Sequence, residues 1–217
     1  MSRRSVAHQA PPEQPRTVQY DHSAIDNMYR RRAVRAFQGE RLDEFTIRRL
    51  LDAAVQAPTA VHAEPWAFVI VQDPLLLKRL SDRGKAAALE AAAEHHDLLK
   101  APGAAPAQDL SAVLANPEFN IFYNAGTLIV ICARPLTAFV TADCWLAAEN
   151  LMLAACAMGL GTCCIGLSVP LLNTPEVKQE LGIPPEGAAV APIIVGIPEG
   201  PAARVPRKAP EILRWIR

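Results

Sequence analysis

The sequence predicts a domain that mixes helices and strands. Residues 43–55, with Asp43 as the N-cap, place apolar side chains at the i, i+3, i+4, i+7 spacing of an amphipathic helix. Short apolar runs at 67–71, 127–132 and 188–195 are typical of buried strands. With 217 residues and 51% hydrophobic content, the chain is long enough to build one sizeable core from such elements.

The composition excludes several classes of protein. Lys plus Arg and Asp plus Glu number 22 each, so the formal net charge is zero, which argues against nucleic acid as a partner. No long uncharged apolar run is present, and we expect no membrane span. The five cysteines lie in apolar segments without metal-ligand spacing, which predicts no metal site and the reduced thiols of a cytoplasmic protein. Whether the adjacent pair Cys163 and Cys164 is redox-active stays open.

The chain is expected to begin with a tail. Residues 1–20 are rich in Pro, Arg, Gln and Ser and have no apolar signal-peptide segment, so we predict a disordered tail there. The single domain then spans residues 21–217. Its first element is a short helix that starts near Ser23 and shows Met28 and Tyr29 on one face.

The stretch from Arg31 to Phe37 follows this helix and carries three guanidinium groups within five residues. Arg31, Arg32 and Arg35 are permanently charged, and each offers a planar fork of donors that fits phosphate oxygens. The intervening Val34 and Phe37 are suited to anchor the stretch to a core. Taken alone, the stretch is more typical of a solvated basic run.

A loop bracketed by Pro58 and Pro65 joins the helix at 43–55 to the next strand. The side chains of Thr59, His62 and Glu64 bring a hydroxyl, an imidazole and a carboxylate together within six residues. Such a rigid connection suits the wall of a binding site. An ordinary connection with solvated polar side chains is the alternative.

Two further helical segments are predicted in the middle of the chain. Residues 75–99 form a long, Ala-rich helical segment, whereas prolines and glycine prevent one continuous helix over 101–118. Residues 140–158 are apolar nearly all round, which predicts a helix that is buried on most sides and ends at Gly159.

Three polar residues interrupt the apolar helix at 140–158. We expect Asp143, Glu149 and Asn150 to be satisfied polar groups and not catalysts.

The last third of the chain contains clear start and stop signals. Residues 161–166 are predicted to form a strand that follows the glycine-ended helix. Thr174 and Pro175 begin another helix, which Gly182 ends. Pro192 interrupts the last strand and predicts either a sheet edge or a bulge.

The arginine stretch, followed by the Pro-Thr-Ala-Val-His-Ala-Glu-Pro-Trp loop and a strand, resembles the nitroreductase family of FMN-dependent flavoproteins. The resemblance covers roughly residues 24–213, with a gap in the middle. It implies an α+β, three-layer sandwich in which helices flank a central, mainly antiparallel sheet. It also implies a lid at about residues 85–120 and an intertwined homodimer. In that dimer, the loop between Pro58 and Pro65, called the Thr59 loop below, and the arginine stretch would reach one site from different chains.

The same resemblance implies which residues hold FMN. The expected cofactor-binding residues are Arg31, Arg32, Ala33, Val34, Arg35, Pro58, Thr59, Ala60, Cys164, Ile165, Gly166 and Arg207. No glycine-rich phosphate motif occurs, so arginine side chains must hold the phosphate, and Arg31, Arg32 and Arg207 are the candidates. Arg35 is expected beside the flavin N1, where it would favour reduction. No catalytic side chain is assigned, because the flavin carries the chemistry.

The activity that the resemblance implies is transfer of hydride from NADH or NADPH, through FMN, to a small organic acceptor such as a nitroaromatic or a quinone. His62 and Glu64 are most similar to the iodotyrosine deiodinase branch, so reductive dehalogenation is one alternative. The lid departs from that branch, because Glu90 and Glu94 are followed by histidines and no matching Tyr and Lys occur. A flavin-binding protein without turnover is the second alternative.

Overall fold

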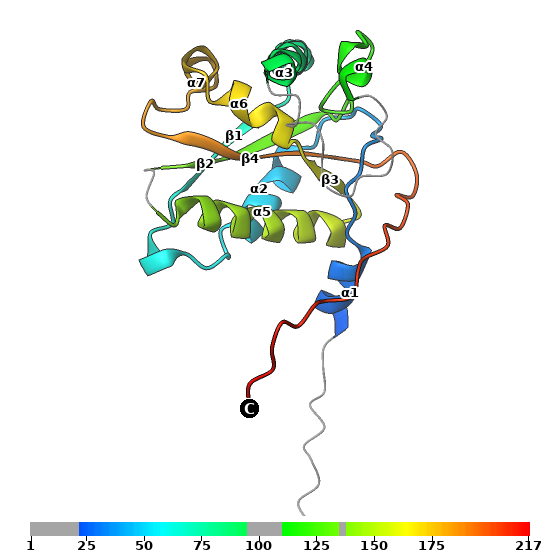
Figure 1. The fold of residues 1–217 in the computed structure, drawn as a ribbon, viewed down its shortest axis with the longest axis vertical. Helices are drawn as coiled ribbons and strands as arrows, with labels where there is room; N and C mark the ends of the chain where they lie inside the picture. The colour runs from blue at the N-terminus through cyan, green and yellow to red at the C-terminus, as the bar shows by residue number, and fades with distance from the viewer. Residues whose placement is uncertain (1–21, 95–109, 135–137) are drawn as a thin grey trace, which may run out of the picture.

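A four-stranded sheet lies between two layers of helices in the computed structural model, which describes residues 22–94, 110–134 and 138–217 (Figure 1). The sheet has the strand order β1-β2-β4-β3, and all three strand pairs are antiparallel. The strands are β1 (Trp66–Val71), β2 (Thr127–Ala133), β3 (Gly161–Cys164) and β4 (Ala188–Gly196). This architecture confirms the α+β sandwich with a mainly antiparallel sheet.

The two helical layers cover opposite faces of the sheet (Figure 1). One layer contains α2 (Glu44–Ala54) and α5 (Val140–Ala157). The other contains α3 (Pro74–Glu94), α4 (Leu110–Ala115), α6 (Val169–Leu172) and α7 (Pro175–Leu181). Three further helical segments are α1 (His22–Arg30), η1 (Ala60–His62) and η2 (Gly166–Ser168), which leads directly into α6.

The alternation of side chains along β2 divides the interior into two cores. Leu128 and Val130 pack among residues of α3, α4, α6 and α7. Ile129 and Ile131 point the other way and pack among residues of α2 and α5. Because successive side chains of a strand face opposite sides, one continuous apolar run supplies both cores.

Two helices begin and end where the capping residues predict. The carboxylate of Asp43 accepts a hydrogen bond from the Thr46 amide at 2.8 Å in front of α2. The Thr174 hydroxyl accepts from the Val177 amide at 3.4 Å in front of α7, and Gly182 ends this helix with φ 69°. These contacts confirm both caps.

The expectation that Pro192 marks an edge strand is wrong, because β4 lies between β2 and β3. A bulge is present nearby but not at the proline: the register shifts between Ile131 and Cys132, which leaves Val190 of β4 without a partner, whereas Pro192 pairs with Val130. The sheet accommodates Pro192 because β3 ends at Cys164, one residue short of it. The Pro192 carbonyl accepts the Ile165 amide at 2.9 Å. The Ile165 carbonyl, which faces the position of the missing proline amide, instead accepts the Ser168 amide at 3.0 Å.

Several expectations fall on parts of the chain outside the described residues. These are the tail at 1–20, the continuation of α3 to Leu99, and the central part of the lid at 95–109. Within the described ranges, α4 forms a separate short helix, in agreement with a break in residues 101–118. No helix in these ranges is long and apolar enough to span a membrane.

Helix α5 buries one face and leaves the other exposed, in contrast to the expectation that it is buried on most sides. Residues such as Ala147 and Leu151 are completely buried against the sheet and α2. On the opposite face Trp145 is 41% exposed and Leu146 is 46% exposed. Although α5 is apolar on all sides, one of its faces is left uncovered by the other parts of the described chain.

Candidate functional site

The arginine stretch runs along the outer edge of β3. Ala33 forms a parallel bridge with Thr162, whose carbonyl accepts the Val34 amide at 2.9 Å. Gly161 permits this close approach, because a Cβ atom at that position would lie 2.8 Å from the Val34 side chain. Val34 and Phe37 are both buried, as expected for anchors. The sheet edge thus fixes the backbone from which the arginine side chains extend.

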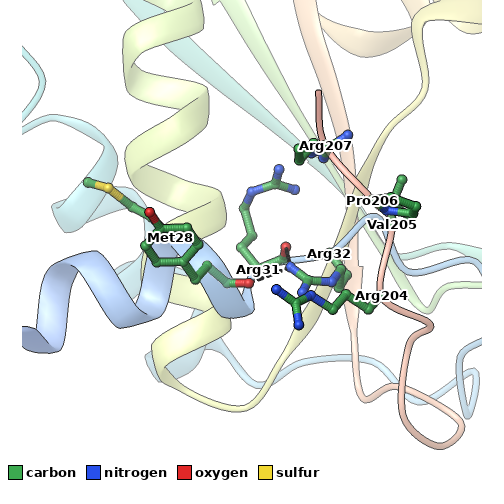
Figure 2. A pocket seen from close by; sticks show the side chains of 8 residues that line it. Met28, Arg31, Arg32, Arg204, Val205, Pro206 and Arg207 are labelled. Carbon is green, nitrogen blue, oxygen red and sulfur yellow. Dashed lines mark hydrogen bonds between the residues drawn. The ribbon is translucent and has the colours of Figure 1, made fainter. Parts of the chain in front are cut away.

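A pocket of about 540 Å³ lies between the end of α1, the arginine stretch and the C-terminal segment (Figure 2). Figure 2 shows the Arg31 side chain extending toward Arg207, while Arg204 lies nearer Arg32. The structure therefore brings Arg31, Arg32 and Arg207 into one pocket, as the sequence predicts. Arg204 also lines this pocket and was not singled out from the sequence.

The four arginines of this pocket differ in their existing partners. Arg31 Nε lies 3.5 Å from Glu149 Oε1. Arg32 Nη1 donates to the carbonyls of Tyr29 at 2.6 Å and Arg31 at 2.7 Å, so it closes the C-terminal end of α1. Arg204 and Arg207 make no hydrogen bond or ion pair with any other described residue. An anion entering the pocket thus meets two guanidinium groups with all donors available.

Arg35 lines a second pocket, of about 180 Å³, on the other side of the stretch. Its guanidinium carbon lies 6.0 Å from the centroid of the Tyr123 ring, a cation–π arrangement. The segment Cys164, Ile165 and Gly166, which the family resemblance assigns to cofactor binding, lines the same pocket. Apolar and aromatic side chains complete the wall: Leu110, Leu114, Phe119, Ile121 and Leu167.

A buried lysine that was not identified from the sequence anchors the segment that contains Phe119, one of the residues lining the second pocket. Lys85 on α3 is 6% exposed, and its ammonium donates to the carbonyls of Phe119 at 2.8 Å and Asn116 at 3.2 Å. It also lies 3.3 Å from a carboxylate oxygen of Asp82. This buried cation ties the segment after α4 to α3. No sequence signal distinguishes Lys85 from the other lysines of a polar helix face.

The adjacent thiols are unreactive in this environment. Burial raises the pKa of Cys164 to about 11, and it also raises the pKa of Cys163, against the opposing effect of Arg35. Both thiols are therefore protonated near neutral pH and are poor nucleophiles. Cys163 packs in the core beneath α3, whereas Cys164 packs toward Met152 on α5, so the pair does not point in one direction. No group of three potential metal ligands occurs among the residues that the structure describes.

The Thr59 loop lies at the opposite end of α5 from the arginine stretch (Figure 1). Pro58, Thr59 and Ala60 accordingly line neither arginine pocket within one chain. The loop contains residues with left-handed backbone: φ is 50° at Val61, and 53° and 43° at His62 and Glu64. These side chains are exposed, with Val61 at 94%.

The three polar residues of α5 have different environments. Asn150 donates to the Ala53 carbonyl at 3.3 Å, and Glu149 faces Arg31. Asp143 accepts the Ala60 amide through Oδ1 at 3.2 Å. Its second oxygen, Oδ2, is buried without a hydrogen-bond partner among the described residues. The expectation that Asp143 is a satisfied polar group is therefore wrong for Oδ2.

Comparison with known proteins identifies related chains. The protein-family sequence model described as "Nitroreductase family" matches residues 28–197 of this chain. A NADH dehydrogenase of Thermus thermophilus is 29% identical over 196 residues, which cover 82% of this chain and 89% of that protein. A crystal structure of a nitroreductase with bound FMN from Bacteroides fragilis superposes with a TM-score of 0.72 and 23% identity. That superposition covers 89% of this chain and 98% of the other, and it shows a shared fold.

One further match is local. Iodotyrosine deiodinase 1 of Sus scrofa is 40% identical to this chain over 53 residues. These residues cover 24% of this chain and 18% of the deiodinase.

Proposed function

Because the chain belongs to the nitroreductase family, we propose that it is an FMN-dependent oxidoreductase that draws hydride from NADH or NADPH. Its electron acceptor would be a small organic molecule, such as a nitroaromatic or a quinone. The observation that carries the proposal is the convergence of Arg31 and Arg207, from opposite ends of the chain, on one pocket beside a second pocket lined by Arg35. Bound FMN would supply the hydride chemistry.

The first pocket fits the FMN phosphate. A phosphate that is nearly a dianion needs several cationic donors when it leaves water, and Arg204 and Arg207 are both available for that purpose. Arg31 adds a third guanidinium, which it shares with Glu149. Each charge-assisted hydrogen bond contributes about 1.5–3 kcal/mol. Two or three such contacts are sufficient to anchor the phosphate without a glycine-rich loop.

The second pocket fits one edge of a planar ring. Its walls are apolar and aromatic, and Arg35 is the one positive charge among the described residues that line it. Four residues of extended chain span about 13 Å, so Arg31 and Arg35 reach places separated by roughly the length between a phosphate and a ring. A cation at the pyrimidine edge stabilises negative charge on a reduced ring. Arg35 would thus tune the flavin while Arg31 holds the phosphate.

We further propose that the protein is a homodimer in which each site uses both chains. The uncovered face of α5, with Trp145 and Leu146, offers an apolar contact surface. The C-terminal segment adds Leu213 and Trp215, which are 91% and 68% exposed in one chain. The Thr59 loop, remote from the pockets of its own chain, would then reach the site of the second chain.

The dimer is tested by replacing Trp145 with Glu and measuring mass by sedimentation at low protein concentration. The charge on the contact face should make the Glu variant mainly monomeric, in contrast to the dimeric parent, and should cause it to release FMN. A parent protein that sediments as a flavin-loaded monomer would contradict the dimer but not the oxidoreductase.

Reductive dehalogenation is the second candidate function. The local match to a deiodinase, together with His62 and Glu64 in the Thr59 loop, favours it. The segment Cys164, Ile165 and Gly166 has no side-chain hydroxyl that could donate a hydrogen bond to the flavin, which argues against a dehalogenase of the deiodinase type. Dithionite-reduced protein that removes halide from a halotyrosine would place this activity first.

The main proposal is tested on purified protein by its absorption spectrum and by anaerobic addition of NADH or NADPH. We expect flavin absorption bands that the nucleotide bleaches and that a quinone then restores. Flavin bands that neither nucleotide bleaches would indicate a flavin-binding protein without this turnover. A protein that neither contains nor takes up FMN would contradict the proposal.

A further inference from the structure

The loop that follows Pro58 holds an unfavourable backbone conformation. Val61, His62 and Glu64 all have positive φ, at 50°, 53° and 43°. Left-handed backbone is costly for residues other than glycine, most of all for a β-branched residue such as Val61. Such strain persists only where surrounding contacts impose it. Something must therefore fix this loop, and the exposed side chain of Val61 cannot do so by packing.

Two of the loop's hydrogen bonds are local. The Ala63 amide donates to the Ala60 carbonyl at 3.0 Å, and the Glu64 amide donates to the Thr59 hydroxyl at 3.4 Å. These bonds shape the turn but do not attach it to the rest of the protein. Within the described structure, the one hydrogen bond from residues 59–64 to a distant element joins the Ala60 amide to Asp143 Oδ1 at 3.2 Å.

Asp143 itself occupies an unfavourable position. It lies in the first turn of α5, is 4% exposed, and leaves Oδ2 buried without a partner among the described residues. A buried acceptor without a donor costs free energy, which the positive end of the helix dipole offsets only in part. An apolar side chain at this position would not carry that cost. The contact that sets the carboxyl group apart from an apolar side chain is its bond to Ala60.

We propose that Asp143 is a positioning residue that fixes the Thr59 loop in the shape required at the flavin ring. By accepting the Ala60 amide, its carboxyl group holds the strained turn, and in the proposed dimer the turn then presents the Thr59 end of the loop to the cofactor of the second chain. The inference rests on the proposed function, because it assigns a task to a loop of that same site. It predicts that cofactor binding depends on an acceptor oxygen at residue 143.

The test compares Asp143→Leu with Asp143→Asn. Leucine removes the acceptor, whereas asparagine keeps an oxygen where Oδ1 lies. We expect Asp143→Leu to weaken binding of both FMN and riboflavin by about tenfold or more, because the loop acts on the ring and not on the phosphate. The thermal midpoint of each variant is measured as well, because leucine is larger than aspartate and adds packing strain at this buried site. Asp143→Asn should retain binding to within about threefold.

A matched control is available on the same helix. Asn150 also joins α5 to another element through one hydrogen bond, to the Ala53 carbonyl, but it does not touch the loop. Asn150→Leu should lower the thermal midpoint and leave the affinities for FMN and riboflavin unchanged. Equal flavin affinities for Asp143→Leu and the parent would overturn the proposal. A loss in Asp143→Leu that merely follows a loss of stability would do the same.

Hydrogen exchange of the loop separates this inference from the proposed function. In Asp143→Leu without added flavin, amides of residues 59–65 should exchange at least about tenfold faster than in the parent, and asparagine should restore the protection. This readout applies even if the parent binds no flavin. If Asp143→Leu does not fold, Asp143→Glu serves instead, because it keeps the charge and moves the oxygen. Unchanged loop exchange in these variants would refute a positioning role.

Discussion

The Nε atom of Arg31 lies 3.5 Å from Oε1 of Glu149, so this cation of the proposed phosphate pocket already has an anionic neighbour. The Arg31 side chain is 21% exposed and the Glu149 side chain 49% exposed. A phosphate bound by Arg31 would share its guanidinium with this carboxylate and would be repelled by it. Glu149 on α5 therefore limits the affinity of the pocket for anions.

Replacing Glu149 with Gln should tighten FMN binding. Partly exposed ion pairs contribute about 0.2–1 kcal/mol, so the dissociation constant should fall by up to about fivefold. Riboflavin, which lacks the phosphate, should bind the variant and the parent alike. Fluorescence titration of the flavin-free proteins measures both ligands. Weaker FMN binding by the Gln variant would show that Glu149 supports the pocket.

Arg207→Ala and Arg31→Ala should each weaken FMN binding by about one to two orders of magnitude. Each change removes one charge-assisted contact to the phosphate, at about 1.5–3 kcal/mol. Riboflavin affinity should not change. Arg48→Ala serves as the control, because Arg48 pairs with Glu44 on the surface of α2. Equal losses for FMN and riboflavin would place these arginines elsewhere than at the phosphate.

Arg35→Met should lower the midpoint potential of bound FMN and slow its reduction by nucleotide. Methionine keeps the apolar length of the side chain and removes the charge beside Tyr123. The reduced flavin carries more negative charge than the oxidised form, so loss of a nearby cation should shift the potential by about 20–60 mV, or about 1–3 kcal/mol. A redox titration decides this. An unchanged or higher potential would mean that Arg35 is not beside the ring.

Gly161→Ala should displace the arginine stretch. A Cβ atom there would lie 2.8 Å from the Val34 side chain, which is too close for two carbons. Overpacking of this kind costs about 1–3 kcal/mol, which lowers the thermal midpoint by about 2–10 °C in a domain of this size. Gly166→Ala is the control for stability, because no atom lies within 4 Å of a Cβ at that position. A calorimetric midpoint that is equal in the two variants would contradict the role of Gly161.

The local signals in the sequence were sufficient for most of the fold. Asp43, Thr174 and Gly182 act through contacts with their own neighbours, and each lies at the helix end that its chemistry predicts. Pro192 was misassigned because its tolerance depends on where β3 ends, and β3 is a distant segment. A strand's neighbours are set by topology, which residue type alone does not reveal.

The candidate site was predictable only in part, for the same reason. The arginine stretch and Arg207 carry a recognisable residue type, and the structure brings them into one pocket. The second roles of these residues were hidden: Arg32 closes α1 through backbone carbonyls, and Arg31 pairs with Glu149. The sequence also could not reveal that Oδ2 of Asp143 lacks a hydrogen-bond partner among the described residues, because this results from the packing of α5 against a loop.

The bridge between Ala33 and Thr162 also constrains the order of events during synthesis. Thr162 pairs with Val195 of β4 on its other side, so the edge that receives the arginine stretch is complete only after β4 has joined the sheet. Contacts between such distant segments form late, because they require closure of long loops. While the chain emerges from the ribosome, the arginine stretch has no completed sheet edge to pair with. If Arg207 holds the phosphate as proposed, capture of the cofactor would be deferred until translation has passed Arg207.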